Sequence, residues 1–234
     1  MNRKVFTGLQ QGPFGKFSLM LVALIALVVF YPSADGHPFE TLILLMLGAF
    51  TLIGGLWAVA DRRSTLIVGV ALGIPCFLFN STPVLGHHSF HALSGLFSVS
   101  FYLYITVHLI NNVLRAPRVT TDIIAGSIAI YLLLGITWAV FYTAIDSFLP
   151  GSFTATAPLG NKESSAFAHA DFIYFSFCTI STLGYGDIVP VRPLARSFAF
   201  LEAMTGVIYI AVFVGRIVSL HKPLGQATHH SKTP

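Results

Sequence analysis

The stretch that decides the fold is Asp171-Phe-Ile-Tyr-Phe-Ser-Phe-Cys-Thr-Ile-Ser-Thr182, followed directly by Leu183-Gly184-Tyr185-Gly186-Asp187. Residues 171–182 are mostly apolar but too few to cross a bilayer, so they predict a short re-entrant helix with Asp171 at its N-cap. The negative end of the helix dipole would lie at Thr182 and favour a cation just beyond it. Gly184 and Gly186 indicate a backbone that leaves the helix in conformations opposed by a Cβ, with successive carbonyls directed at one axis.

Long apolar segments flank this stretch and fill most of the chain. Of the 234 residues, 55% are hydrophobic and 9% are charged, whereas a soluble domain has about 25% charged residues. The net charge of +4 is therefore no sign of a nucleic-acid partner, and the expected partner is the lipid bilayer. We predict an all-α membrane protein with six transmembrane helices, at residues 17–31, 41–60, 64–80, 89–112, 122–145 and 197–220.

The basic residues are distributed unevenly between the two sides of these helices. Ten of the 13 fall on one side: Arg3, Lys4, Lys16, Arg62, Arg63, Arg115, Arg118, Arg216, Lys222 and Lys232. Only Lys162, Arg192 and Arg196 fall on the other. Because cytoplasmic loops are enriched in Lys and Arg, we expect both termini in the cytoplasm. The short loops favour a multi-pass protein of a prokaryotic plasma (inner) membrane.

The predicted spans divide the chain into four parts. Residues 1–16 form a cytoplasmic N-terminal segment, 17–112 a peripheral bundle of four helices, 113–220 a domain built around the glycine run, and 221–234 a short cytoplasmic tail. Within residues 113–220 we expect an outer helix at 122–145, the re-entrant helix at 171–182 and an inner helix at 197–220. We expect no soluble domain after residue 220.

The run Thr182-Leu-Gly-Tyr-Gly-Asp187 resembles the T-V-G-Y-G-D signature of potassium channels. Gly206 stands twenty residues after Gly186, where the simplest bacterial potassium channels have a hinge glycine, and Arg196 also matches. The Asp-x-x-Tyr-Phe-Ser stretch from Asp171 is similar to the pore helices of bacterial and two-pore potassium channels. The resemblance covers residues 120–220, so 171–182 would be the pore helix and 182–187 the selectivity filter.

This resemblance implies passive, potassium-selective conduction without covalent chemistry, so we do not expect an enzyme. The ion ligands would be Thr182, Leu183, Gly184, Tyr185 and Gly186, with K⁺ bound at the first four. We expect no cofactor, since K⁺ would be the ion that permeates and not a bound cofactor. One chain supplies one filter loop and four are needed, which predicts a homotetramer in a closed ring. A separate regulatory subunit remains open.

The stretch also departs from the family pattern at several positions. Leu183 replaces the usual valine, and Tyr174 and Phe175 stand where many members have a tryptophan pair that braces the filter. Cys178 occupies a position that some bacterial members fill with glutamate. The Tyr174 hydroxyl could still form a hydrogen bond with Asp187, whereas the side chain of Phe175 has no hydrogen-bond donor. Our hypothesis is a filter held by fewer hydrogen bonds, with altered inactivation.

The sequence also bears on opening of the pore. Residues 89–112 contain no arginine, so the fourth helix cannot serve as a conventional voltage sensor. By alignment with simple channels, an apolar ring in the inner helix should line the cavity and gate it by narrowing; the alternative is packing between helices. Its members are Val207, Ile210, Ala211 and Val214. Gly206 is either a bend or a close-packing glycine.

Three titratable side chains are candidates for pH sensing. Glu202 lies well inside a spanning helix, and could be a proton sensor or a neutral acid bonded to the pore helix from behind. His87 and His91 are one turn apart, a spacing that suits a metal or proton site, although interfacial histidines are also common.

Other functions remain as alternatives to a selective channel. They are a non-selective cation channel and a non-conducting regulatory membrane protein with a vestigial pore. A potassium-uptake subunit is disfavoured, because such proteins resemble four pore repeats and this chain has one.

Overall fold

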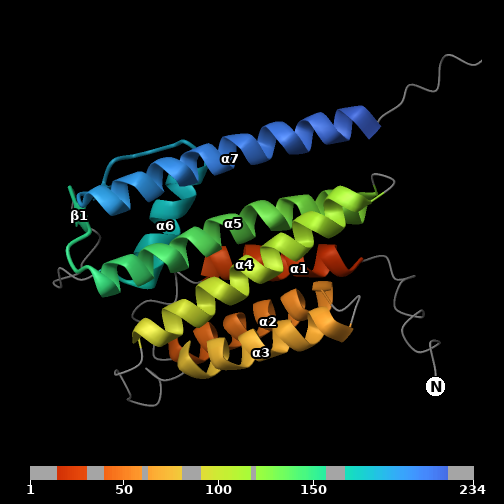
Figure 1. Cartoon of the computed structure of the whole chain (residues 1–234), viewed down its shortest axis with the longest axis horizontal. Helices are drawn as coiled ribbons and strands as arrows, with labels where there is room; N and C mark the ends of the chain where they lie inside the picture. The colour runs from red at the N-terminus through yellow and green to blue at the C-terminus, as the bar shows by residue number, and fades with distance from the viewer. Residues whose placement is uncertain are drawn as a thin grey trace, which may run out of the picture.

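The computed structural model describes residues 15–30, 40–59, 63–80, 91–116, 120–156 and 167–220. These residues form helices and one two-stranded antiparallel ribbon (Figure 1). The helices are α1 (Lys16–Phe30), α2 (Glu40–Val59), α3 (Arg63–Asn80), α4 (His91–Arg115), α5 (Thr121–Phe148), α6 (His169–Ile180) and α7 (Pro193–Leu220). The ribbon pairs β1 (Phe153–Ala155) with β2 (Ile188–Pro190), and it was not predicted from the sequence.

Within the described residues, three helical segments are long and apolar enough to cross a membrane. They are Gly95–Arg115, Thr121–Phe148 and Pro193–Arg216, in α4, α5 and α7. Lys16–Phe30 and Arg63–Leu78 are apolar but shorter. The mostly helical, apolar architecture expected of a membrane protein is therefore present in the described residues, while the total of six spans stays a prediction.

Several helix boundaries differ from the predicted ones for local reasons. Helix α7 begins four residues before residue 197, with Pro193 as its first residue; a proline is favoured there because the first helical N–H needs no partner. Helix α5 begins after Thr120, whose Oγ1 accepts the Ile123 N–H at 3.2 Å. Both helices are therefore longer than the apolar segments predicted from the sequence.

The prediction of Asp171 as the N-cap of the re-entrant helix is wrong. The N-cap is Ala168, and Asp171 is the third residue of α6. Its Oδ2 accepts the backbone N–H of Ala168 at 2.7 Å. A carboxylate at this position caps the helix from within, which is also where the positive end of the helix dipole favours an acid.

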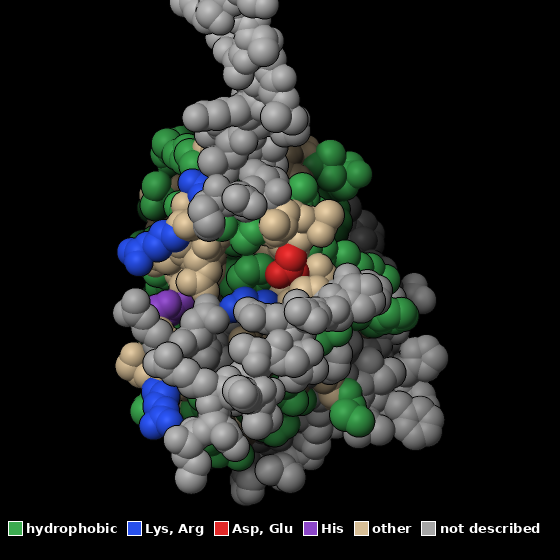
Figure 2. All heavy atoms as spheres, turned by 90° about the vertical axis from the view of Figure 1, so that its right-hand side faces the viewer, with side chains coloured by type: hydrophobic (Ala, Val, Ile, Leu, Met, Phe, Trp, Pro, Cys, Tyr) green, Lys and Arg blue, Asp and Glu red, His purple; other side chains and the backbone are tan. Residues whose placement is uncertain are grey.

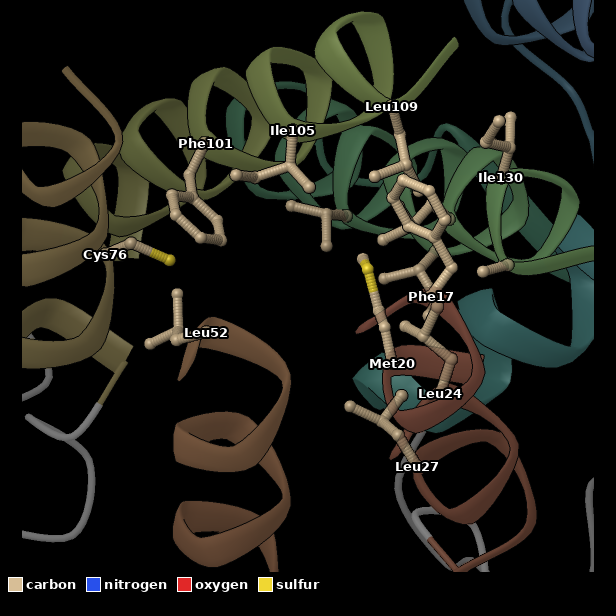
Figure 3. Packing of buried hydrophobic residues seen from close by; sticks show 14 of the residues in the cluster. Phe17, Met20, Leu24, Leu27, Leu52, Cys76, Phe101, Ile105, Leu109 and Ile130 are labelled. Atoms are coloured by element: carbon tan, nitrogen blue, oxygen red, sulfur yellow. The ribbon is translucent and has the colours of Figure 1, made fainter. Parts of the chain in front are cut away.

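The helices pack in layers around α5. Helix α7 lies on one side of α5, and α2 and α3 lie on the other side, beyond α1 and α4 (Figure 1). The main apolar core lies between α1, α4 and α5, where Phe17 and Met20 point toward Leu109 and Ile130 (Figure 3). A second, aromatic core surrounds Tyr142 between α5, β1 and α6.

The described basic residues gather at the two ends of the bundle. Lys16, Arg63, Arg115 and Arg216 lie at the end where α1 begins and α4 ends, whereas Arg192 lies at the opposite end, between β2 and α7. Figure 2 looks onto the first of these ends, where basic side chains and an acidic one are exposed on the same face. The Arg216 Nη2 donates to the Ala116 carbonyl at 2.8 Å and ties α7 to the connection after α4.

Asp122, near the start of α5, holds the start of α1. Asp122 Oδ1 accepts hydrogen bonds from the backbone N–H and from the hydroxyl of Ser18, each at 3.0 Å. Gly15 permits this approach, because a Cβ on it would lie 2.1 Å from the Asp122 carboxyl group. A carboxylate of α5 therefore caps a neighbouring helix.

We expect Asp122→Ala to destabilise the docking of α1 by about 1–2 kcal/mol, because two donors of Ser18 lose their acceptor. Asp122→Asn retains one acceptor oxygen and should lose less. Thermal unfolding of the purified protein in detergent would measure the difference. An unchanged melting temperature in Asp122→Ala would show that this cap contributes nothing.

Candidate functional site

The segment after α6 has an alternating backbone. Thr182, Gly184 and Gly186 have φ angles of 60°, 52° and 77°, so every second residue lies in the left-handed region. A Cβ added to Gly184 or Gly186 would meet no atom within 4 Å. Glycine is therefore needed at these two positions for its conformation and not for space. Thr182 adopts the same region with a side chain, at a conformational cost.

The hydrogen bonds of this segment leave the carbonyls of residues 182–185 without a donor among the described residues. The N–H groups of Leu183 and Gly184 both donate to the Cys178 carbonyl, at 2.9 and 3.1 Å, and that of Thr182 donates to Thr179 at 3.0 Å. Among the described residues, none donates to the carbonyls of residues 182–185. The N–H groups thus turn back to α6 while four successive oxygens stay available for a cation.

The outer end of this segment is braced by Tyr174. Its hydroxyl donates to Asp187 Oδ2 at 2.5 Å, while Asp187 Oδ1 accepts the Ile188 N–H at 3.0 Å. The hydrogen bond to Asp187 raises the pKa of Tyr174, so the phenol keeps its proton. The ring of Tyr174 also stacks on Tyr185 with centroids 6.4 Å apart. The contact that the sequence suggested between Tyr174 and Asp187 is thus present.

Phe175 and Cys178 support the segment from behind. Phe175 is buried, and its ring packs edge-on against Tyr142 and Phe153, with centroids 5.2 and 5.4 Å away. Cys178 is a free, buried thiol whose pKa is raised by burial. Its backbone carbonyl accepts the N–H groups of both Leu183 and Gly184.

The side chain of Glu202 joins α5, α6 and α7. Its side chain is fully buried, with the Tyr142 hydroxyl 2.7 Å from Oε2 and the Ser176 hydroxyl 2.5 Å from Oε1. Ser176 also lies 2.7 Å from the Gly135 carbonyl. This is the geometry of an acid bonded to the pore helix from behind. Sequence reasoning missed Tyr142 and Ser176, because they are 60 and 26 residues away and carry no local signal.

Gly206 lies where α7 crosses the end of α6. A Cβ on Gly206 would stand 2.2 Å from the Ile180 carbonyl oxygen. The same oxygen accepts the Tyr131 hydroxyl at 3.2 Å. Helix α7 runs through Gly206 without interruption. In this structure Gly206 is a close-packing glycine, and the predicted hinge remains an expectation.

We expect Gly206→Ala to separate α7 from α6, because a methyl group cannot share space with the Ile180 carbonyl. Overpacking of this kind costs about 1–3 kcal/mol. The loss should appear as a lower melting temperature, whereas Gly215→Ala, where a Cβ meets nothing within 4 Å, serves as the matched control. Equal stability of the two variants would contradict the close contact.

The predicted cavity residues are exposed on α7. Val207, Ile210 and Val214 have 54%, 49% and 52% of their surface accessible, and Ala211 is also exposed. Within the described part of one chain they are therefore not packed between helices. They remain available to line a cavity or to contact another subunit.

The histidine candidates lie largely outside what the structure describes. His87 is outside the described residues; His91 is the first residue of α4, but its side chain is likewise outside them. Another histidine, His169, lies at the start of α6 with Nδ1 2.7 Å from the Thr143 hydroxyl, and burial lowers its pKa to about 4. His169 is thus neutral near physiological pH.

Comparison with known proteins finds similarity to ion channels in this part of the chain. A family model described as "Ion channel" matches residues 128–221. The chain is 35% identical over 89 residues to two pore potassium channel c of Oryza sativa subsp. japonica, and 33% identical over 87 residues to the inward rectifier potassium channel Kirbac3.1 of Paramagnetospirillum magnetotacticum. These alignments cover 38% and 36% of this chain, and 17% and 24% of the relatives.

A longer similarity extends beyond the matched domain. The voltage-gated potassium channel Kch of Escherichia coli (strain K12) is 28% identical over 182 residues, covering 77% of this chain and 38% of that protein. The chain thus aligns with well under half the length of these curated relatives, and no solved structure matches it significantly. Residues 128–221, which contain the alternating backbone and the carbonyls of residues 182–185, are thus similar to ion-channel domains, and the relatives named above are potassium channels.

Proposed function

We propose that this chain is one subunit of a homotetrameric channel that conducts K⁺ passively and selectively across the membrane. The observation that carries the proposal is the set of unpaired carbonyls of residues 182–185, on a backbone of alternating handedness at the negative end of α6. Four such sets around an axis can replace the hydration shell of a potassium ion. Residues 182–187 are accordingly named the filter below.

The exposure of α7 supports an assembly of several chains. Only 11% of its membrane-spanning window is buried within one chain, against 50% for α5. A closed ring would cover part of this surface with the neighbouring subunits and turn another part toward the central cavity. We propose that Val207, Ile210 and Val214 line that cavity and form an apolar gate.

We propose that the channel is not steeply voltage-gated. Arg115, in the last turn of α4, is the single lysine or arginine of that helix. Moving one charge through 100 mV supplies about 2.3 kcal/mol, so steep gating needs several charges within the span. The uneven distribution of basic residues favours the end with Arg115 and Arg216 as the cytoplasmic one. Both termini would then lie on the cytoplasmic side of a plasma membrane.

The reversal potential of the purified protein in a planar bilayer tests this proposal, with potassium on one side and sodium on the other. A value close to the potassium equilibrium potential is expected. A reversal near zero with measurable current would favour a non-selective cation channel, in which Leu183 has loosened the filter. Silence across a range of pH and voltage would favour the non-conducting alternative.

A further inference from the structure

The ribbon of β1 and β2 brings a distant segment to the outer end of the filter. Antiparallel pairing sets Phe153 opposite Pro190, Thr154 opposite Val189 and Ala155 opposite Ile188. The next step of the ladder places Thr156 beside Asp187, and the Thr156 N–H donates to the Asp187 carbonyl at 2.8 Å. We call residues 152–156 the strap.

Thr156, the last residue of the strap, binds the backbone carbonyl of Gly186, the second glycine of the filter. The Thr156 hydroxyl lies 2.6 Å from the Gly186 carbonyl oxygen and 3.3 Å from that of Asp187, so its hydrogen goes to Gly186. The carbonyls of residues 182–185 have no such donor among the described residues. The Gly186 carbonyl is therefore held differently from the four that precede it.

The strap is a rigid base for this contact. Ser152 is fully buried; its N–H donates to Asp146 Oδ1 at 3.2 Å and its carbonyl accepts the Val191 N–H at 2.9 Å. Phe153 is also buried and packs edge-on against Phe172 with centroids 5.0 Å apart. Buried anchors of this kind place Thr156 more precisely than a free loop could.

The peptide that follows Gly186 needs such a restraint. Gly186 has a φ of 77°, and glycine has the widest choice of backbone conformations, so its own geometry does little to fix the direction of its carbonyl. Gly184 is tied to α6 through its N–H, whereas the Gly186 carbonyl is held by the Thr156 hydroxyl. From these contacts we propose that Thr156 is a positioning residue for conduction, which fixes the Gly186 carbonyl at the outer mouth of the filter.

This inference rests on the proposed function, and single-channel recording tests it. Thr156→Val removes the hydroxyl but keeps the side-chain shape and the backbone N–H, while Thr156→Ser restores a hydroxyl. We expect open lifetimes at low external potassium to be roughly two- to tenfold shorter in Thr156→Val, as loss of one hydrogen bond implies. The difference should shrink at high external potassium, because bound ions also hold the carbonyls.

Thr154→Val is the matched control, because Thr154 is an exposed threonine two residues earlier in the strap. It should leave the open lifetime unchanged, and Thr156→Ser should restore it. A merely structural role for Thr156 would lower the number of channels and leave their lifetime alone. Unchanged lifetimes in Thr156→Val in a conducting channel would overturn this inference alone, whereas a silent wild type would overturn it together with the proposed function.

Discussion

Gly184→Ala is expected to abolish potassium-selective current while the protein still folds and assembles. Gly184 has a φ of 52°, and an L-residue in the left-handed region pays about 1–2 kcal/mol. Four subunits would multiply this cost to about 4–8 kcal/mol for each filter. The segment can relieve the strain by turning to negative φ, which would move the carbonyls on either side out of register with those of the other subunits.

Gly151→Ala is the matched control for this experiment. Gly151 has a φ of 74°, and as at Gly184 an added Cβ meets nothing within 4 Å. It lies before β1, outside the filter, so the same backbone penalty should leave selectivity intact. Reversal potentials under a potassium–sodium gradient, with native gels for assembly, compare the two variants. Wild-type selectivity in Gly184→Ala would mean that the filter is not where we place it.

Glu202→Leu is expected to lower stability by about 1–3 kcal/mol per chain, because the buried Tyr142 hydroxyl loses its acceptor. The Ser176 hydroxyl has one hydrogen but lies near two oxygens, those of Gly135 and Glu202. A protonated Glu202 gives the Tyr142 hydroxyl, the Ser176 hydroxyl and the Gly135 carbonyl a partner each. It can accept from Tyr142 and donate to Ser176, while Ser176 donates to Gly135. An ionised carboxylate in this buried position would also carry a large desolvation cost.

Glu202→Gln tests which form of the acid is present. Its amide can donate to Ser176 and accept from Tyr142, as a protonated carboxyl does, so we expect wild-type stability. Melting temperatures and assembly of Glu202→Gln and Glu202→Leu provide the comparison, with Met204→Leu at an exposed position of the same helix as control. If Glu202→Gln loses as much stability as Glu202→Leu, the negative charge itself is required and the neutral-acid interpretation fails.

The features that could be predicted from the sequence are those governed by local chemistry. A glycine every second residue after a short apolar helix specifies the positive φ angles, and these are seen at Gly184 and Gly186. Long apolar segments specify helices because each backbone polar group must be satisfied within the segment. Even so, the start of α6 was misplaced, because a capping carboxylate acts equally well from within the first turn.

The contacts that support the filter were decided by the tertiary structure. Glu202 meets partners in α5 and α6, Gly206 meets the Ile180 carbonyl, and Thr156 meets the Gly186 carbonyl across 30 residues. A lone serine, tyrosine or threonine in an apolar chain does not indicate which carbonyl or carboxylate it will bind. The sequence by itself therefore determined the long apolar helices and the positive φ angles of Gly184 and Gly186, since both follow from neighbouring residues. Only the packing of α5, α6, α7 and the strap decided what holds that backbone, because its hydrogen-bond partners are far apart along the chain.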